Sequence, residues 1–177
     1  MKAGIILYQS KYGATEQYAT WLQDSTGFDC LQTQNSSLKD ILQYHVIILC
    51  GGVYASGIAG LSFLKKNIDQ LQGKKLAVLC VGASPYDARA LAQLKARNLA
   101  GRLAEIPLFY ARGAWNEEKM TRIDRTLCKL LQKSIAKKDP ATYEPWMDAL
   151  MCAKGQVCDW TDRAYLTPLL EYINGAE

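Results

Sequence analysis

Ser10-Lys11-Tyr12-Gly13-Ala14-Thr15 lies between the apolar run Ala3–Tyr8 and a helix-like segment from Thr15 to about Gln23. The run predicts a short buried strand, and the glycine predicts a turn directly before the helix. Free backbone N–H groups and the positive end of the helix dipole converge at such a turn, which therefore suits an anion. The hydroxyls on either side of Gly13 favour a single terminal phosphate monoester.

Two familiar nucleotide motifs do not fit this turn. A Walker A motif would need a glycine followed by Gly-Lys-Ser/Thr at fixed spacing. A dinucleotide fingerprint would need three glycines, and only Gly13 is present. A purely structural interpretation also remains, in which the segment is a strand-to-helix turn and Ser10 is a local cap. This stretch alone leaves both interpretations open.

Length and composition indicate one globular domain. The chain has 177 residues, of which 49% are hydrophobic and 21% are charged. The first apolar run is too short for a signal peptide, and no run approaches the length that spans a membrane, so we expect a cytoplasmic protein. Six cysteines without a Cys-x-x-Cys pair and a single histidine lack the spacing of a metal site. We therefore expect reduced thiols and no bound metal.

Apolar runs alternate with helix-like segments over the first two thirds of the chain. Strand candidates are Ala3–Tyr8, Phe28–Thr33, His45–Cys50, Leu76–Val81 and Pro107–Ala111. Continuous apolar runs of this length are typical of strands that are buried on both faces of a parallel sheet, between two layers of helices. We predict an α/β fold with a doubly wound, five-stranded parallel sheet in the order 2-1-3-4-5.

Ligands of such sheets bind outside the carboxyl ends of the strands, where the strand order reverses. Besides the first turn, two predicted loops reach that rim: residues 51–57 with Tyr54, and residues 82–87 with Tyr86. With a phosphate site on the first turn, one tyrosine on each of these loops predicts a slot that binds a flat ring joined to the phosphate. Either tyrosine could instead be an ordinary exposed aromatic residue. We expect the glycines at 51, 52, 57 and 82 to turn with positive φ and to let the backbone approach the ring.

Over residues 2 to about 115 the sequence resembles the flavodoxin-like FMN-binding family. The resemblance is carried by Ile5–Thr15, by Val46–Gly52, and by Gly73–Val78 running into Gly82. It implies that the FMN phosphate lies on Ser10, Tyr12, Gly13, Ala14 and Thr15, with Lys11 in the same turn. It also implies that the isoalloxazine lies against Tyr54 and Tyr86, with Gly51, Gly52, Gly82, Ala83 and Asp87 around its edge. The flavin would supply the chemistry, so we predict no catalytic side chain.

The last third of the chain departs from a simple flavodoxin pattern. We treat residues 1–177 as a single flavodoxin-like domain in which residues 116–160 form a helical insert before a final helix. Asn116–Lys138 predicts a basic amphipathic helix, with seven Lys/Arg against three Asp/Glu. Either this helix packs on the domain through Leu127, Leu130 and Leu131, or residues 116–138 contact an anionic lipid surface or a carboxylate-bearing substrate.

The resemblance implies a flavoprotein that performs electron transfer or flavin-dependent oxidoreduction. Its partner would be a redox protein or a small-molecule electron donor or acceptor, and no nucleic-acid motif is present. The insert and the segment Cys158–Asp162 look similar to the oxygen-independent protoporphyrinogen dehydrogenase branch, which oxidises a tetrapyrrole and passes electrons toward quinone at the membrane. That activity is an alternative function. A flavin-free interaction module that retains the fold is a second alternative.

Overall fold

The computed structural model describes residues 2–175 and is built on a parallel sheet extended by one short antiparallel strand. The parallel strands follow the order β2-β1-β3-β5-β6. Their bounds are β1 Lys2–Gln9, β2 Asp29–Gln32, β3 Tyr44–Tyr54, β5 Lys75–Gly82 and β6 Leu108–Arg112. Counted as parallel strands alone, this is the predicted order 2-1-3-4-5, and the doubly wound α/β fold is confirmed.

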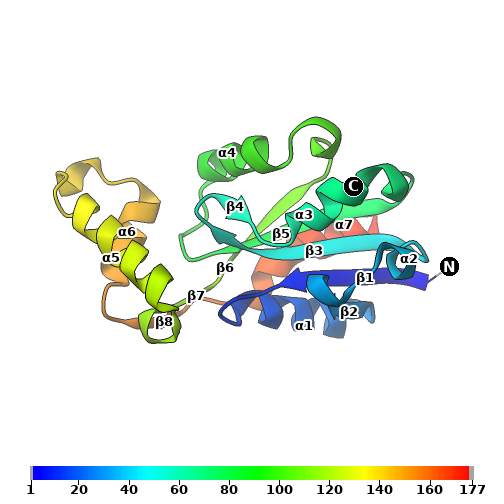
Figure 1. Cartoon of the computed structure of the whole chain (residues 1–177), viewed down its shortest axis with the longest axis horizontal. Helices are drawn as coiled ribbons and strands as arrows, with labels where there is room; N and C mark the ends of the chain where they lie inside the picture. Colours follow the sequence, from blue (N-terminus) through cyan, green and yellow to red (C-terminus); the bar gives the residue numbers. More distant parts are fainter. Residues whose placement is uncertain (1, 176–177) are drawn as a thin grey trace.

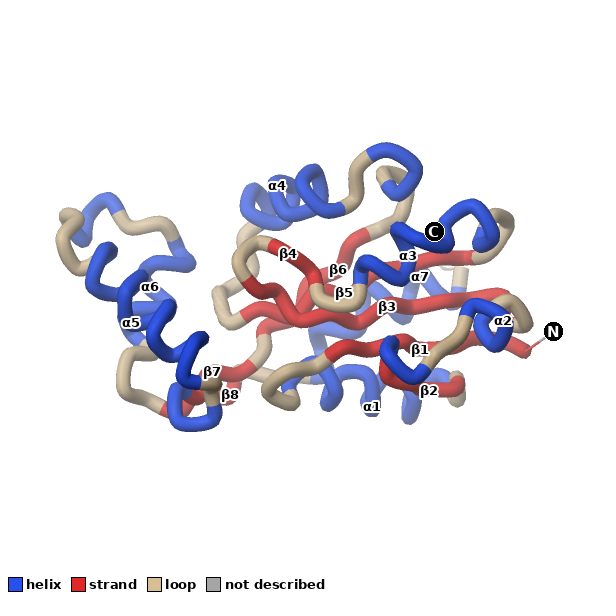
Figure 2. Tube along the Cα trace, in the orientation of Figure 1, coloured by secondary structure: helices blue, strands red, loops and turns tan. Residues whose placement is uncertain are grey.

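Helices cover both faces of the sheet (Figures 1 and 2). One face packs against α1 (Ala14–Thr26) and α7 (Thr167–Asn174), and the other against α2 (Leu38–Ile41), α3 (Leu61–Asn67) and α4 (Ala88–Asn98). Successive side chains of β3 point to opposite faces of the sheet. Ile48 is buried on the face covered by α1 and α7, and Ile47 on the face covered by α2, α3 and α4. Both sides of each central strand are therefore buried, which explains the continuous apolar runs.

The glycine-rich segment after the predicted third strand is not a loop, as we had expected. β3 continues to Tyr54 and then pairs antiparallel with β4 (Gly57–Ile58). The chain reverses at Ala55 and Ser56, whose φ angles of 47° and 64° are left-handed. The prediction of positive φ at residues 51, 52, 57 and 82 is wrong, because the two turn residues make the reversal instead.

Gly51 is required for close packing of two backbone segments and not for a turn. A Cβ built at this position would lie 2.2 Å from the carbonyl oxygen of Ala59, a distance that real Cβ atoms do not tolerate. Only glycine therefore lets the segment after β4 fold back so closely over β3.

The insert lies beyond the carboxyl ends of the sheet strands (Figure 1). It contains α5 (Arg122–Ile135) and α6 (Pro145–Cys152), and it is flanked by an antiparallel pair, β7 (Ala114–Asn116) and β8 (Val157–Asp159). Short 3-10 turns lie at Thr33–Asn35, Ile68–Leu71, Gly101–Leu103, Glu117–Lys119, Pro140–Thr142 and Arg163–Leu166. Within residues 2–175, no helix combines the length and the apolar content needed to cross a membrane.

The predicted helix 116–138 is shorter than its sequence pattern indicated. Asn116 accepts hydrogen bonds from the N–H groups of Glu118 and Lys119, which favours a separate 3-10 turn. Thr121 then caps α5 by accepting a hydrogen bond from the N–H of Asp124 at 3.2 Å. The helix therefore begins at Arg122 and ends at Ile135.

The apolar side of α5 does not pack on the domain. Leu127, Leu130 and Leu131 are 59%, 57% and 43% exposed, so the first of the two alternatives, packing on the domain through these leucines, is wrong. The buried residues of α5 are Gln132 and Ile135. The orientation of α5 is set by its hydrogen bonds to the rest of the insert, and these leave the leucines facing solvent.

Candidate functional site

The turn between β1 and α1 has the backbone geometry of an anion site. Gly13 directly precedes α1 with a φ of 100°, a value that L side chains rarely adopt. Ser10 accepts a hydrogen bond from the N–H of Gly13 at 3.1 Å, which closes the turn before the helix without capping α1 itself. No side chain caps the start of α1, which leaves the first N–H groups of a 13-residue helix without a side-chain partner.

Thr15 supplies a hydroxyl to the same turn. The residue is only 3% exposed, and none of the hydrogen bonds among residues 2–175 uses its hydroxyl group. Its Oγ1 atom is not one of the fully buried side-chain atoms that lack a partner, so the hydroxyl itself is open to solvent although the residue as a whole is buried. A solvent-accessible hydroxyl in the first turn of a helix is free to donate to an anion bound at that turn.

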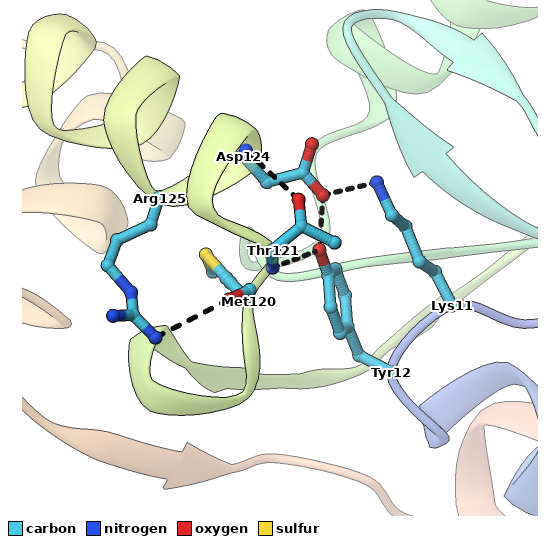
Figure 3. Close-up of polar contacts among 6 residues, drawn as sticks. All are labelled: Lys11, Tyr12, Met120, Thr121, Asp124 and Arg125. Carbon is cyan, nitrogen blue, oxygen red and sulfur yellow. Dashed lines mark hydrogen bonds and ion pairs between the residues drawn. The ribbon is translucent and has the colours of Figure 1, made fainter.

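Lys11 and Tyr12 are held by the insert (Figure 3). Both side chains donate hydrogen bonds to the same carboxylate oxygen of Asp124, on the first turn of α5. The Tyr12 hydroxyl in turn accepts a hydrogen bond from the N–H of Thr121 at 3.3 Å. The hydrogen bonds from Lys11 and Tyr12 hold the pKa of Asp124 below its usual range, and the bond to Asp124 raises the pKa of Lys11.

Tyr54 joins this cluster from the tip of the β3–β4 hairpin. Its ring packs edge-on against the ring of Tyr12, with 6.3 Å between centroids. The ammonium group of Lys11 lies 5.8 Å from the centroid of Tyr54, within the range of a cation–π contact. Partial burial raises the pKa of the Tyr54 hydroxyl above its ordinary value.

The segment after β5 is held by β6 and the residue that follows it. Tyr110 donates a hydrogen bond to the carbonyl of Ser84 at 2.5 Å, and Arg112 donates one to the carbonyl of Ala83 at 3.0 Å. The N–H of Gly113 bonds the carbonyl of Gly82 at 2.7 Å. Three backbone carbonyls of the segment are therefore already used, and its conformation is fixed.

Two further predicted site residues lie on this segment. Tyr86 is 59% exposed and its ring tilts against that of Tyr110 at 6.3 Å. Asp87 does not face the turn after β1. Its carboxylate caps α4 by accepting a hydrogen bond from the N–H of Ala90 at 2.6 Å. Asp87 is thus a helix cap in this structure, and a site role for it has no support from its contacts.

The structure divides the predicted site residues into two groups. The turn after β1 and Tyr54 form one connected cluster, and the segment 82–87 forms another around Tyr110 and Arg112. The residue after β6 reaches the start of α1, since a Cβ built at Gly113 would lie 3.3 Å from the Cβ of Ala14. Gly51 and Gly52 are buried inside β3, and a Cβ at Gly52 would meet the ring of Tyr54 at 2.7 Å.

Sequence reasoning missed several residues at this rim. The guanidinium of Arg112 lies 4.0 Å from the ring centroid of Trp160. The hydroxyl of Tyr18 donates to the carbonyl of Arg112 at 2.6 Å and accepts from the N–H of Asp162 at 3.0 Å, and burial raises its pKa to about 12. The position of Arg112 at the carboxyl end of a strand was a usable signal. Asp124 gave none, because its partners lie far away in the sequence.

The chemistry available at the rim is anion and aromatic-ring binding. The turn offers backbone donors, the Thr15 hydroxyl and a lysine, and the ring of Tyr54 packs against Tyr12 beside it. Among residues 2–175, no cluster of three or more His, Cys, Asp or Glu side chains could hold a metal ion.

A sequence model of the flavodoxin domain family matches residues 5–142, which include the sheet, the rim and most of the insert. The chain belongs to the flavodoxin domain family. This match covers more than half of the chain, so the resemblance noted for residues 2 to about 115 is confirmed and extends into the insert. No curated protein matches this flavodoxin-domain chain.

Solved structures similar to this flavodoxin-domain protein include two flavodoxins and a Trp repressor binding protein. The two-electron reduced Megasphaera elsdenii flavodoxin is 16% identical, covering 60% of this chain and 82% of its own, with a TM-score of 0.48. The Streptococcus pneumonia TIGR4 flavodoxin is 20% identical, covering 74% and 99%, with a TM-score of 0.44. The Trp repressor binding protein from Bacillus subtilis is 17% identical, covering 63% and 84%, with a TM-score of 0.48.

Proposed function

We propose that this protein is an FMN-binding flavoprotein that performs electron transfer or flavin-dependent oxidoreduction. The observation that carries the proposal is the first turn of α1, which no side chain caps and in which the hydroxyl of Thr15 lies beside the free backbone N–H groups. Membership of the flavodoxin domain family supports a flavin as the ligand. Six free cysteines, two of them buried in β3 and β5, suit a reducing compartment, and we place the protein in the cytoplasm.

The residues of the turn fit a phosphate monoester. The N–H groups of Ala14 and Thr15 and the Thr15 hydroxyl would hold the phosphate oxygens, and Lys11 would contribute charge. Asp124 already pairs with Lys11, so the backbone donors and the hydroxyl would bear most of the phosphate binding. Tyr54 and Tyr86 would contact the isoalloxazine ring.

When bound, FMN supplies the hydride or single-electron chemistry, and the protein supplies binding and orientation. The hydrogen bonds of Tyr110 and Arg112 hold the segment after β5 in one conformation, so little of it would need to be ordered on binding. No side chain has to transfer a proton in this proposal.

The test is a titration of the purified protein with FMN and, separately, with riboflavin, followed by quenching of flavin fluorescence. Thr15→Val keeps the side-chain shape and removes the hydroxyl, so FMN should bind 10- to 100-fold more weakly while riboflavin binding is unchanged. Thr20→Val is the control, because that hydroxyl only bonds the carbonyl of Glu16 in its own helix. A wild-type protein that binds neither flavin would refute the proposal and favour the flavin-free interaction module.

A second candidate is a dehydrogenase of the protoporphyrinogen or quinone type. The observation that favours it is that the insert is attached directly to the first turn of the rim through Asp124 while exposing an apolar helix face beside it. Anaerobic mixing of the flavin-loaded protein with NADH, NADPH and a quinol in turn tests this candidate. Bleaching by the quinol alone is expected, and bleaching by a nicotinamide alone would contradict it.

A further inference from the structure

The exposed face of α5 is a continuous aliphatic stripe. Ile123, Leu127, Leu130 and Leu131 are 73%, 59%, 57% and 43% exposed. They occur at i, i+4, i+7 and i+8, a spacing that places them along one side of a helix. Isolated exposed leucines are ordinary, but four large aliphatic side chains gathered on one helix face indicate a surface that meets an apolar phase.

The opposite side of α5 is fixed, so the stripe cannot turn inward. Gln132 and Ile135 are each 2% exposed, and the hydroxyl of Tyr143 donates to the carbonyl of Ile135 at 3.0 Å. Arg125 donates to the carbonyls of Glu117 and Glu118 at 2.8 and 2.7 Å. These hydrogen bonds form only in the present rotation of the helix, which leaves the aliphatic side facing outward.

A basic stripe runs along one flank of the aliphatic one. Arg122, Lys129 and Lys133 are exposed and lie at i, i+7 and i+11, and none of the ion pairs within residues 2–175 uses them. Residues 122–138 carry six Lys/Arg and one acidic side chain. That acidic residue is Asp124, which faces Lys11 and Tyr12 (Figure 3). The exposed face therefore combines aliphatic side chains with uncompensated positive charge.

We propose that this face of α5 docks on an anionic membrane surface. Leucine and isoleucine beside lysine and arginine are the composition of helices that lie in the headgroup region, with the aliphatic side in the acyl chains and the cations on the lipid phosphates. A second copy of the chain fits less well, since pairing the same face around a two-fold axis would bring two basic stripes together. A protein partner is also disfavoured, because lysine is depleted and aromatic residues are enriched at protein interfaces.

Docking through α5 would place the rim of the sheet close to the lipid. The first turn of α5 is held to the turn after β1 through Asp124, and the hydroxyl of Tyr12 is bonded to the N–H of Thr121. If the proposed flavin binds at that turn, the membrane contact would bring it near electron carriers dissolved in the bilayer. The docking itself does not depend on the flavin.

The test is co-sedimentation of the full chain with vesicles of phosphatidylglycerol and phosphatidylcholine, compared with vesicles of phosphatidylcholine alone. We expect binding to the mixed vesicles at least tenfold tighter than to the neutral ones, and weaker as salt rises. Leu127→Glu with Leu130→Glu should lower the affinity at least tenfold. Lys129→Glu with Lys133→Glu should abolish the preference for the anionic vesicles.

Matched controls lie outside the insert. Leu31→Glu with Leu42→Glu changes two leucines that are each 39% exposed, and Lys65→Glu with Lys66→Glu changes two exposed lysines of α3. Neither pair should alter vesicle binding by more than about twofold, and circular dichroism should show all variants folded, since every changed side chain is exposed.

Three outcomes would overturn the proposal. These are no binding of the wild type to anionic vesicles, equal losses in the control variants, or a wild-type dimer in ultracentrifugation that Leu127→Glu converts to monomer without any vesicle binding. FMN titration of the same samples separates this result from failure of the proposed function, because vesicle binding does not require flavin.

Discussion

Asp124 accepts hydrogen bonds from Lys11, a residue 113 positions earlier in the chain, and the pair joins the insert to the turn between β1 and α1. The side chains of Lys11 and Asp124 are 43% and 25% exposed, so solvent screens the ion pair and its free energy is modest, about 0.5–1 kcal/mol. The ion pair matters for binding because Lys11 is the only lysine of the predicted phosphate turn, residues 10–15, and Asp124 occupies its ammonium group.

Replacing Asp124 by Asn should strengthen anion binding at the turn. The change removes a negative charge beside Lys11 and frees that ammonium group for a phosphate, so we expect FMN affinity to rise about two- to fivefold. Lys11→Met should lower it by a similar factor. Fluorescence titration measures both, with Asp69→Asn as a control for charge outside the rim. If Asp124→Asn weakens FMN binding as much as Lys11→Met does, Asp124 instead organises the turn.

The attachment of the insert should depend on pH at both extremes. Because the pKa of Asp124 is lowered in the folded state, its contribution is complete above about pH 4 and is lost as pH falls through the lowered value. Because the pKa of Lys11 is raised, its contribution is complete below about pH 10 and is lost as pH rises through the raised value. Protection factors of the amides in the first turn of α5, which are corrected for the pH dependence of intrinsic hydrogen exchange, should be highest between these limits. An identical acid profile in Asp124→Asn would contradict this assignment.

Gly51→Ala should destabilise the fold. The new methyl group would lie 2.2 Å from the carbonyl oxygen of Ala59, so the segment after β4 must move, at a cost of about 1–3 kcal/mol. Gly57→Ala is the matched control in the same hairpin: its Cβ would meet its nearest neighbour at an ordinary 3.4 Å. Urea unfolding measures both variants. Equal losses of stability in the two would show that the close approach at Gly51 is not the cause.

Thiol reactivity should follow burial. Cys50 and Cys80 are fully buried, and burial raises the pKa of both thiols, that of Cys80 to about 12. Cys152 is exposed on α6. In the native protein a disulfide reagent should modify Cys152 within minutes and leave Cys50 and Cys80 unmodified until the protein unfolds. Mass spectrometry of the labelled peptides identifies the sites, and early labelling of Cys50 would indicate that β3 opens.

The sequence by itself determined the sheet. Ile47 and Ile48 point to opposite faces of β3 and both are buried, so a strand covered by helices on both sides must be apolar at every position. The turn between β1 and α1 was predictable for a similar reason: a glycine between a strand and a helix, with hydroxyls beside it, is a local pattern. Such features depend on neighbours within a few residues or on the burial of whole segments.

Only the tertiary structure decided the rest. Periodicity showed that Leu127, Leu130 and Leu131 share one side of α5, but it cannot say whether that side meets the domain or the solvent. Hydrogen bonds of Gln132 and Arg125 to segments of the insert outside α5 decided that. The glycines of β3 were mistaken for a loop because only pairing with β4 makes them part of a strand. The contact of Asp124 with Lys11 likewise depends on how the chain folds back on itself, and no local pattern encodes such a distance.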